Sequence, residues 1–235
     1  MLSAPAKRAI SATVPCHRYY STKAKDVWKE SHSASFYAAA KQISSIPKST
    51  GVPEIIVTGR ANAGKSTLLN AVLGRTTLLS TSKKAGHTKS LNFYAIGSEP
   101  AKLYLVDAPG YGARGRPEWG ALFDHYVQNR EELKRVYILF NAKHGLNQFD
   151  IHMLSHLSQF LMTDRGVQPF TLQSVITKAD IIPIDDTRAI IEKMRSEIFA
   201  AAPLCLPPIV TSAAMNPPFG LDALRSNIAD ACGFR

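Results

Sequence analysis

Short apolar runs alternate along this chain with longer stretches in which apolar residues recur every three or four positions. The runs are rich in Val, Ile and Leu, as expected of strands buried in a sheet, and they lie at 55–57, 91–96, 103–106, 136–140, 172–176 and 209–210. The longer stretches predict amphipathic helices at 67–73, 117–126, 151–161, 185–198 and 221–228. The alternation predicts an α/β fold, a mostly parallel sheet of about six strands with helices on both faces.

Three local features refine this outline. Only Gly97-Ser98-Glu99-Pro100 separates the strands at 91–96 and 103–106, which predicts a hairpin. Residues 75–90 are polar and lack apolar periodicity, which predicts a loop. Asp185 or Asp186 is placed to cap the helix that follows.

The segment before the first parallel strand, residues 21–50, is predicted to be an extension with a short helical lead-in over 26–50. Its larger apolar residues could pack on the domain that follows, and they are Trp28, Phe36, Tyr37 and Ala40. Pro and Gly residues between 47 and 53 break this helix, so we expect the main domain to span 51–235.

The strand at 55–57 leads directly into a phosphate-binding loop with the pattern Gly-x-x-x-x-Gly-Lys-Ser. Glycines let successive backbone N–H groups turn toward an anionic oxygen, and the N-terminus of the next helix also faces that anion. The candidate phosphate-binding residues are Gly59, Arg60, Ala61, Asn62, Ala63, Gly64, Lys65, Ser66 and Thr67. A chance glycine-rich turn is the alternative, and the required order of strand, loop and helix argues against it.

A second motif, Asp107-Ala108-Pro109-Gly110, follows the strand at 103–106. In the presence of a phosphate loop, Asp107 is expected to hold Mg²⁺ through water, together with the hydroxyl of Ser66. The N–H of Gly110 would then meet a γ-phosphate, and Lys65 would contact the outer phosphates. Alone, this tetrapeptide would more often be a simple turn.

A third motif, Thr177-Lys178-Ala179-Asp180, selects the base. A carboxylate at Asp180 can accept two parallel hydrogen bonds from guanine, whereas adenine has no such pair of donors. The stem of Lys178 can lie over the purine, and a loop at Ser212-Ala213 could offer backbone N–H groups to guanine O6. Each piece is weak alone, but together they favour GTP over ATP.

These motifs resemble those of the YihA/EngB family of Ras-like GTPases, and the resemblance extends from about Phe36 to the C-terminus. The matching stretches are Gly59 to Asn70, Gly86-His87-Thr88-Lys89, Asn92-Phe93, Asp107 to Gly112, and Thr177 to Asp180. The chain departs from the family at Phe140-Asn141-Ala142-Lys143, where Asp-x-Arg is more common.

The resemblance implies a GTPase that acts in maturation of the large ribosomal subunit. It implies that Thr88 closes on Mg²⁺ and the γ-phosphate, so that Lys65, Thr88 and Gly110 are the candidate catalytic residues. It also implies a potassium ion beside the phosphates, held with the help of Asn62; the alternative is that Asn62 only braces the loop through a backbone hydrogen bond. Tyr111 stands where Ras-like enzymes often carry a glutamine that orients water.

The net charge of +10 is concentrated at the N-terminus, where residues 1–50 hold eight basic and two acidic side chains. The first 25 residues have five basic side chains and no acid, which fits a mitochondrial transit peptide over 1–20 that is cleaved after Tyr20. An ordinary disordered basic tail is the alternative. We therefore expect the protein in the mitochondrial matrix, with a precursor of the mitochondrial large subunit, containing rRNA and ribosomal proteins, as its partner.

Other basic residues are compatible with an RNA partner but equally with a solvated loop, and they are Lys83, Lys84, His87, Lys89, Arg114 and Arg116. No apolar run is long enough to predict a membrane span, and the three cysteines are too far apart to indicate a metal site or a disulfide framework.

Two other classes of function remain open from the residues alone. A nucleotide-gated binding module with negligible turnover is compatible with the tyrosine at position 111. A small-molecule kinase or ATPase is disfavoured by the guanine-reading residues.

Overall fold

The fold is known from a computed structural model that describes residues 27–79, 90–112, 117–161 and 169–234. The strands are β1 (Ser35–Ala40), β2 (Glu54–Gly59), β3 (Leu91–Ile96), β4 (Leu103–Asp107), β5 (Leu133–Asn141), β6 (Thr171–Thr177) and β7 (Leu206–Val210). The α-helices are α2 (Lys65–Val72), α3 (Pro117–Asn129), α4 (Gln148–Leu161), α5 (Ile184–Ala201) and α6 (Leu221–Ala231). Three short 3-10 turns join them, η1 (Ser31–Ser33), η2 (Ile43–Ser45) and η3 (Ala179–Ile181).

All seven strands of the described chain form one sheet in the order β1-β3-β4-β2-β5-β6-β7. The neighbours from β4 through β2, β5 and β6 to β7 are parallel, and the predicted hairpin of β3 and β4 is antiparallel. The mostly parallel α/β sheet predicted from the sequence is therefore confirmed. The carboxyl ends of β2, β4, β6 and β7 meet at one edge of this sheet.

The extra strand is β1, and the predicted helical lead-in is wrong for residues 35–40. β1 pairs antiparallel with β3, so its alanines extend the sheet although alanine favours helix locally. Phe36 packs edge-on against Tyr94, and Tyr37 packs against Tyr104. The free edge of β3 and these cross-strand aromatic pairs outweigh helix propensity, which is a weak local preference.

The residues just before β1 attach to the domain, as predicted for this segment. The indole Nε1 of Trp28 donates to the carbonyl of Arg225 in α6, at 3.0 Å. Val27 is 2% exposed and belongs to the hydrophobic cluster under α2 and α6. Residues 27–29 are helical, and the segment is part of the folded domain.

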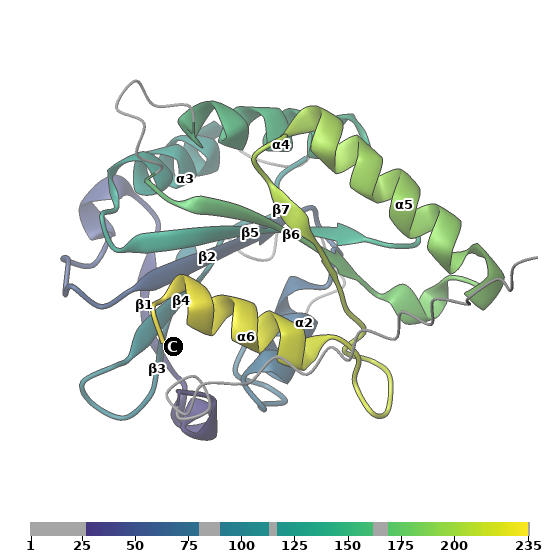
Figure 1. The fold of residues 1–235 in the computed structure, drawn as a ribbon. Coiled ribbons are helices and arrows are strands. Elements are labelled where there is room, and N and C mark those ends of the chain that lie inside the picture. The colour runs from purple at the N-terminus through teal and green to yellow at the C-terminus, as the bar shows by residue number, and fades with distance from the viewer. Residues whose placement is uncertain (1–26, 80–89, 113–116, 162–168, 235) are drawn as a thin grey trace, which may run out of the picture.

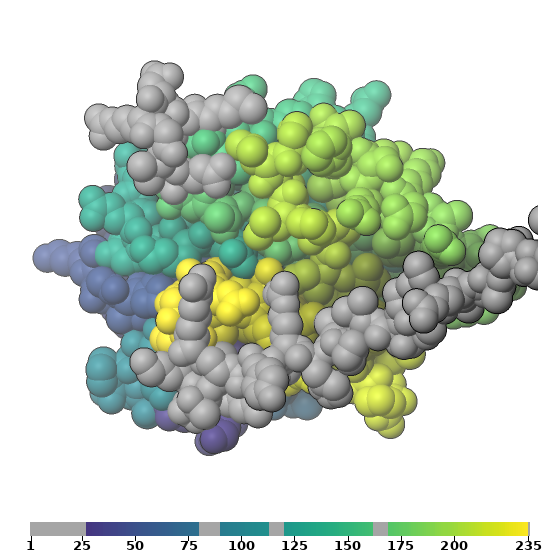
Figure 2. All heavy atoms as spheres, in the orientation of Figure 1, coloured from purple at the N-terminus to yellow at the C-terminus, as the bar shows by residue number. Residues whose placement is uncertain are grey.

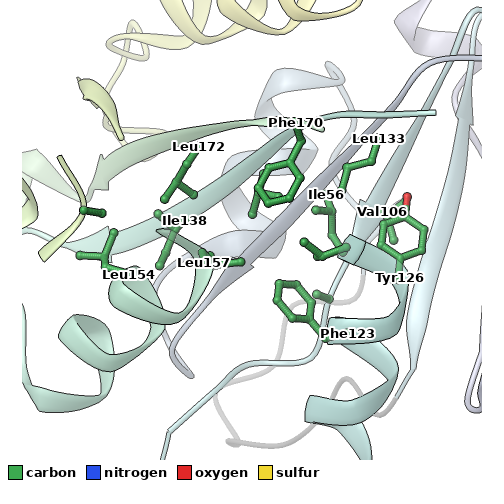
Figure 3. Packing of buried hydrophobic residues seen from close by; sticks show 14 of the residues in the cluster. Ile56, Val106, Phe123, Tyr126, Leu133, Ile138, Leu154, Leu157, Phe170 and Leu172 are labelled. Carbon is green, nitrogen blue, oxygen red and sulfur yellow. The ribbon is translucent and has the colours of Figure 1, made fainter. Parts of the chain in front are cut away.

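Helices cover both faces of the sheet, as Figure 1 shows, with α3, α4 and α5 on one face and α2 and α6 on the other. Under the first group, Ile56, Phe123 and Leu157 meet in a continuous apolar layer (Figure 3). Figure 2 shows the surface that α5 and α6 present on the side of the molecule facing the viewer. The helix positions predicted from periodicity are confirmed.

The predicted helix cap before α5 is a further correction. The helix begins at Ile184 with Pro183 as its N-cap, and no side chain caps it. Asp185 and Asp186 instead lie in the first turn, where their negative charges still complement the positive end of the helix dipole.

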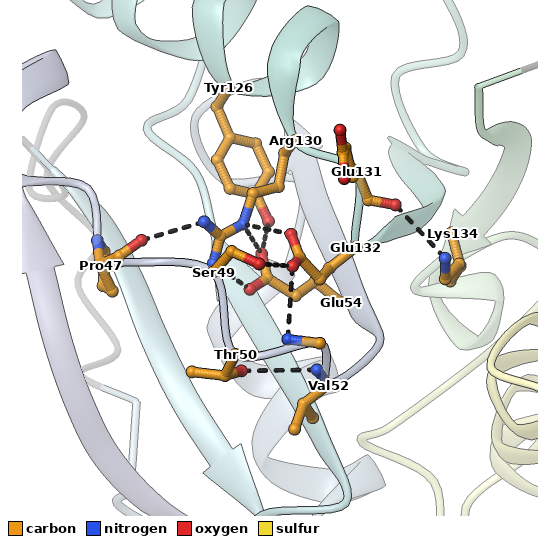
Figure 4. A network of polar contacts seen from close by, with 11 residues as sticks. Pro47, Ser49, Thr50, Val52, Glu54, Tyr126, Arg130, Glu131, Glu132 and Lys134 are labelled. Atoms are coloured by element: carbon orange, nitrogen blue, oxygen red, sulfur yellow. Dashed lines mark hydrogen bonds and ion pairs between the residues drawn. The ribbon is translucent and has the colours of Figure 1, made fainter.

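Buried charged groups at the amino end of the sheet form a closed network, shown in Figure 4. The Glu54 carboxylate, 1% exposed, accepts hydrogen bonds from the hydroxyl of Tyr126 and from Arg130 Nε, the latter at 3.0 Å. Arg130 also pairs with Glu132, which accepts a hydrogen bond from Ser49. Because every buried charge here has a partner, the network secures the chain before β2.

Two further observations concern the whole described chain. None of its helices is both long and apolar enough to cross a membrane. Cys205 and Cys232 are free thiols, and burial raises their pKa to about 11 and about 12 respectively.

Candidate nucleotide-binding site

The phosphate loop lies between the last residue of β2, Gly59, and the first of α2, Lys65. A Cβ on Gly59 would lie 2.9 Å from the carbonyl oxygen of Leu139 in β5, so only glycine fits this close approach. Gly64 and Asn62 have left-handed backbones, with φ of 90° and 64°. The loop therefore curls as predicted, although Asn62 rather than Gly59 supplies the second left-handed residue.

The loop is open to a ligand on one side and anchored on the other. Ala61, Asn62 and Thr67 are exposed, and Lys65 and Ser66 are partly exposed. Behind them, Leu68, Leu69 and Val72 of α2 are at most 2% exposed. The free N–H groups of the first turn of α2 are thus held beside the loop, where an anion can accept from them.

Lys65 and Asp107 bring opposite charges to the centre of this site. The Lys65 ammonium donates to the Gly59 carbonyl at 3.3 Å. Burial lowers the pKa of Lys65, and burial raises the pKa of Asp107 to about 6, with each charge opposing the shift of the other. The attraction between Lys65 and Asp107 therefore does not fully offset the cost of burying their charges.

Asp107 fits the predicted magnesium site. It is 3% exposed, and its Oδ1 has no hydrogen-bond partner among the described residues. A buried carboxylate oxygen without a partner is costly unless a cation or its water fills the place. Asp107 and Ser66 would hold Mg²⁺, a hard cation that prefers oxygen ligands and that, when bound, neutralises phosphate charge.

Gly110 rests directly on the phosphate loop. A Cβ at this position would lie 3.2 Å from both the Ala61 nitrogen and the Gly59 carbonyl oxygen. Glycine at residue 110 favours this close approach of the backbone after β4, because a side chain there would make a tight contact with the loop. This is the placement expected of a backbone N–H that reads a γ-phosphate.

Asp150, which lies in the first turn of α4, belongs to the site but was not predicted from the sequence. Its carboxylate is fully buried, pairs with Arg60 Nε at 2.9 Å and accepts a hydrogen bond from the Tyr111 hydroxyl at 2.8 Å. Arg60 also donates to the carbonyl of Gly145 at 3.1 Å. The available signal was Asn147-x-x-Asp150, the spacing of a helix start with reciprocal caps.

The base-reading motif is joined to the phosphate loop. The hydroxyl of Thr177 donates to the Ala63 carbonyl at 2.6 Å, and the ammonium of Lys178 donates to the Asn62 carbonyl at 3.1 Å. Lys178 has a left-handed backbone, with φ of 57°. Its stem therefore runs from the end of β6 toward the loop, across the place predicted for the purine.

Asp180 and Ser212 meet beyond Lys178, where the hydroxyl of Ser212 donates to the Asp180 carboxylate. The contact orients the carboxylate and was not predicted. The Ser212 N–H donates to the Phe219 carbonyl at 3.0 Å, so it is not the donor to guanine O6 that the sequence suggested. The N–H of Ala213 remains the predicted donor to guanine O6.

The loop between β7 and α6 is closed on itself. The backbone N–H of Phe219 donates to the Ser212 carbonyl at 2.9 Å. Gly220 has φ of 75°, and a Cβ there would lie 2.1 Å from the Val210 carbonyl oxygen. Any residue other than glycine at 220 would therefore push this loop away from the site.

Asn141 occupies the position at which the chain departs from the family pattern. It is 5% exposed, accepts from the Lys143 N–H at 3.0 Å and reaches the Asn62 carbonyl at 3.5 Å. The substitution thus makes a local contact under the phosphate loop. Thr88 and the basic residues at 83, 84, 87, 89, 114 and 116 lie outside the described residues, and their roles stay predictions.

The parallel sheet, the phosphate loop and the base-reading edge define a Ras-like P-loop GTPase. Residues 54–172 match a family model described as the 50S ribosome-binding GTPase. The probable GTP-binding protein EngB of Nitrobacter hamburgensis is 33% identical over 203 residues, 84% of this chain and 88% of that protein. The same protein of Prosthecochloris aestuarii is 40% identical over 133 residues, 54% of this chain and 67% of that one. The chain belongs to the EngB family of ribosome-biogenesis GTP-binding proteins, and it is a GTPase.

Solved structures give the same fold. Era of Aquifex aeolicus, in a complex with GDP and AlF4⁻, is 25% identical with a TM-score of 0.54, and the match covers 77% of this chain and 56% of Era. Era in a complex with MgGDPNP and a segment of 16S ribosomal RNA is 24% identical, with the same TM-score of 0.54. The chain thus spans little more than half of the Era chain.

Proposed function

We propose that this GTPase is an assembly factor of the mitochondrial ribosome and acts on the precursor of its large subunit. The observation that carries the proposal is the match of residues 54–172 to the 50S ribosome-binding GTPases, since the bacterial 50S particle is a large subunit. GTP loading would favour binding to the particle, and hydrolysis to GDP and phosphate would release the protein.

The partner proposed for this chain is a negatively charged particle that contains both RNA and protein. Without residues 1–20, which hold three basic side chains and no acid, the chain keeps a net charge of +7, and the phosphate groups of RNA attract a basic protein of this kind. Era, a fold relative, is known in a complex with 16S ribosomal RNA. Both observations support a pre-ribosomal particle containing rRNA as the partner.

The matrix of the mitochondrion is the proposed location. The support is the composition of the first 25 residues, with five basic side chains and no acid. Cleavage after Tyr20 would leave a mature protein that begins at Ser21. The bacterial relatives have no such organelle, so this part of the proposal depends on the leader alone.

Sedimentation of a mitochondrial matrix extract tests the proposal. With a non-hydrolysable GTP analogue, we expect the protein to migrate with the large ribosomal subunit or its precursor, and with GDP to stay near the top of the gradient. N-terminal sequencing of the same material should read from Ser21. Migration with the small subunit, identical profiles with both nucleotides, or absence of the protein from the matrix would contradict the proposal.

A second candidate is a nucleotide-gated binding module with negligible turnover. Its support is Tyr111, whose hydroxyl donates to the Asp150 carboxylate at 2.8 Å and is therefore not free to orient an attacking water. Multiple-turnover assays with and without ribosomal particles separate the two functions. Phosphate release that accelerates on the particle supports the switch.

We also propose that a potassium ion beside the phosphates assists hydrolysis. Among the described residues the side chain of Asn62 has no hydrogen-bond partner, whereas its carbonyl accepts from Lys178 and Asn141. The backbone thus braces the loop, and the exposed amide side chain is left to help hold a cation that offsets charge on the phosphates.

Single-turnover hydrolysis is expected to be faster in potassium than in sodium at equal ionic strength. Asn62→Gly should abolish the difference while nucleotide binding survives, because glycine removes the side-chain oxygen and freely adopts the left-handed φ of 64° at this position. Equal rates in the two salts, for the protein alone and on its particle, would exclude a potassium site.

A further inference from the structure

We propose that Asp150 is a positioning residue that fixes the segment after β4 to the phosphate loop through Tyr111 and Arg60. One carboxylate oxygen, Oδ1, accepts from the Tyr111 hydroxyl at 2.8 Å. The other, Oδ2, pairs with Arg60 Nε at 2.9 Å. A single buried side chain therefore joins the two segments that would contact the phosphates.

Asp150 can act as an anchor because its own position is fixed. Its Oδ2 accepts from the Asn147 N–H at 2.9 Å, and its own N–H donates to the Asn147 side chain at 3.2 Å. These reciprocal bonds start α4, whose Leu154 and Leu157 are fully buried against the sheet. A residue locked by its own hydrogen bonds on a packed helix holds its partners in a defined geometry.

The charges in this cluster are matched. The Asp150 carboxylate is fully buried, with the Arg60 guanidinium beside it, whose side chain is 24% exposed. Burial and the neighbouring carboxylate raise the pKa of Tyr111 well above its ordinary value, so its hydroxyl keeps the proton that it donates. The cluster is thus stable as a neutral tyrosine, a carboxylate and a guanidinium.

Because of the position of Gly110, this cluster is expected to affect the binding of GTP and not that of GDP. Gly110 precedes Tyr111 directly and lies against Ala61 and Gly59 of the phosphate loop. Its N–H is the group expected to meet the γ-phosphate, which GDP lacks. Loosening Tyr111 should therefore weaken GTP binding and hydrolysis while GDP binding is retained.

Tyr111→Phe tests the proposal, because it removes one hydroxyl and keeps the ring. A hydrogen bond to a charged group corresponds to about 10- to 100-fold in an equilibrium constant. We expect affinity for a non-hydrolysable GTP analogue to fall by a factor at the lower end of this range, roughly tenfold. Single-turnover hydrolysis should slow as well, and GDP affinity should stay at the wild-type value.

The chain supplies a matched control at the opposite end of the sheet. There the Tyr126 hydroxyl donates to the Glu54 carboxylate, which also pairs with Arg130 (Figure 4). Tyr126→Phe removes the same chemical group from the same kind of cluster, far from Gly110. It should lower the melting temperature but leave the ratio of GTP-analogue to GDP affinity unchanged.

A second variant, Asp150→Asn, removes the negative charge of the carboxylate that accepts from the Tyr111 hydroxyl and pairs with Arg60. If both residues act through Asp150, the double variant Tyr111→Phe/Asp150→Asn should be no more impaired than Asp150→Asn alone. An unchanged affinity ratio in Tyr111→Phe would overturn the proposal. An equal loss of GDP and GTP affinity, or the same change of ratio in Tyr126→Phe, would show a merely structural role and would overturn it too.

Discussion

Asp180→Asn is expected to lower GTP affinity by about 10- to 100-fold, because one charged hydrogen bond to guanine is lost. An amide presents a donor where guanine also donates, so the loss includes a repulsive contact. Xanthine carries an acceptor at that position, and xanthosine triphosphate affinity should therefore rise. The structure supports this reading, since the Ser212 hydroxyl orients an otherwise exposed Asp180 carboxylate.

Asp185→Asn is the matched control for this experiment. Asp185 carries the same side chain and is exposed in the first turn of α5, five residues from Asp180. The Asp185→Asn variant should bind GTP with the same affinity as the wild type. Unchanged GTP affinity in Asp180→Asn, or a fall in both variants, would contradict the assignment of guanine recognition to Asp180.

Lys65→Met is expected to reduce GTP affinity by at least about 100-fold, because an ammonium that contacts two phosphates makes two charged hydrogen bonds. Without nucleotide the same substitution should keep or raise the melting temperature. Burial lowers the pKa of Lys65, which means that the folded protein disfavours the charged form. Methionine has a similar length and does not carry that cost.

Calorimetric binding and thermal unfolding, each with and without Mg²⁺-GTP, measure the two effects. Lys193→Met in α5 is a suitable control, because that side chain is 76% exposed. It should leave both quantities unchanged. A large loss of stability in nucleotide-free Lys65→Met would show that Lys65 is a structural residue.

Most of the fold could be predicted because the apolar runs and the helical periodicity in the sequence lie where the strands and helices form. Ile55, Ile56 and Val57 form a β-branched run, and the helix after the loop begins at Lys65, so strand, loop and helix follow from one short stretch. β1 could not be predicted in this way. Its alanines have no strand preference, and the strand forms because β3 offers an unpaired edge and because Phe36 and Tyr37 contact aromatic rings on neighbouring strands.

The same distinction applies to the site. Asp107, Lys178 and Asp180 were identified because strand ends carry them to one edge of a parallel sheet. Asp150 was missed because it lies within an ordinary amphipathic helix, where aspartate usually faces solvent. Its burial depends on Arg60 and Tyr111, which reach it from other parts of the chain.

Side-by-side calorimetric titration of the purified protein with GTP and with ATP, in buffer containing Mg²⁺, tests the central claim most directly. That claim is that the carboxyl edge of the sheet holds a guanine nucleotide. We expect GTP to bind at least about 10- to 100-fold more tightly than ATP, since adenine lacks the donor pair for Asp180. Equal affinity for the two nucleotides, or binding of neither, would contradict it.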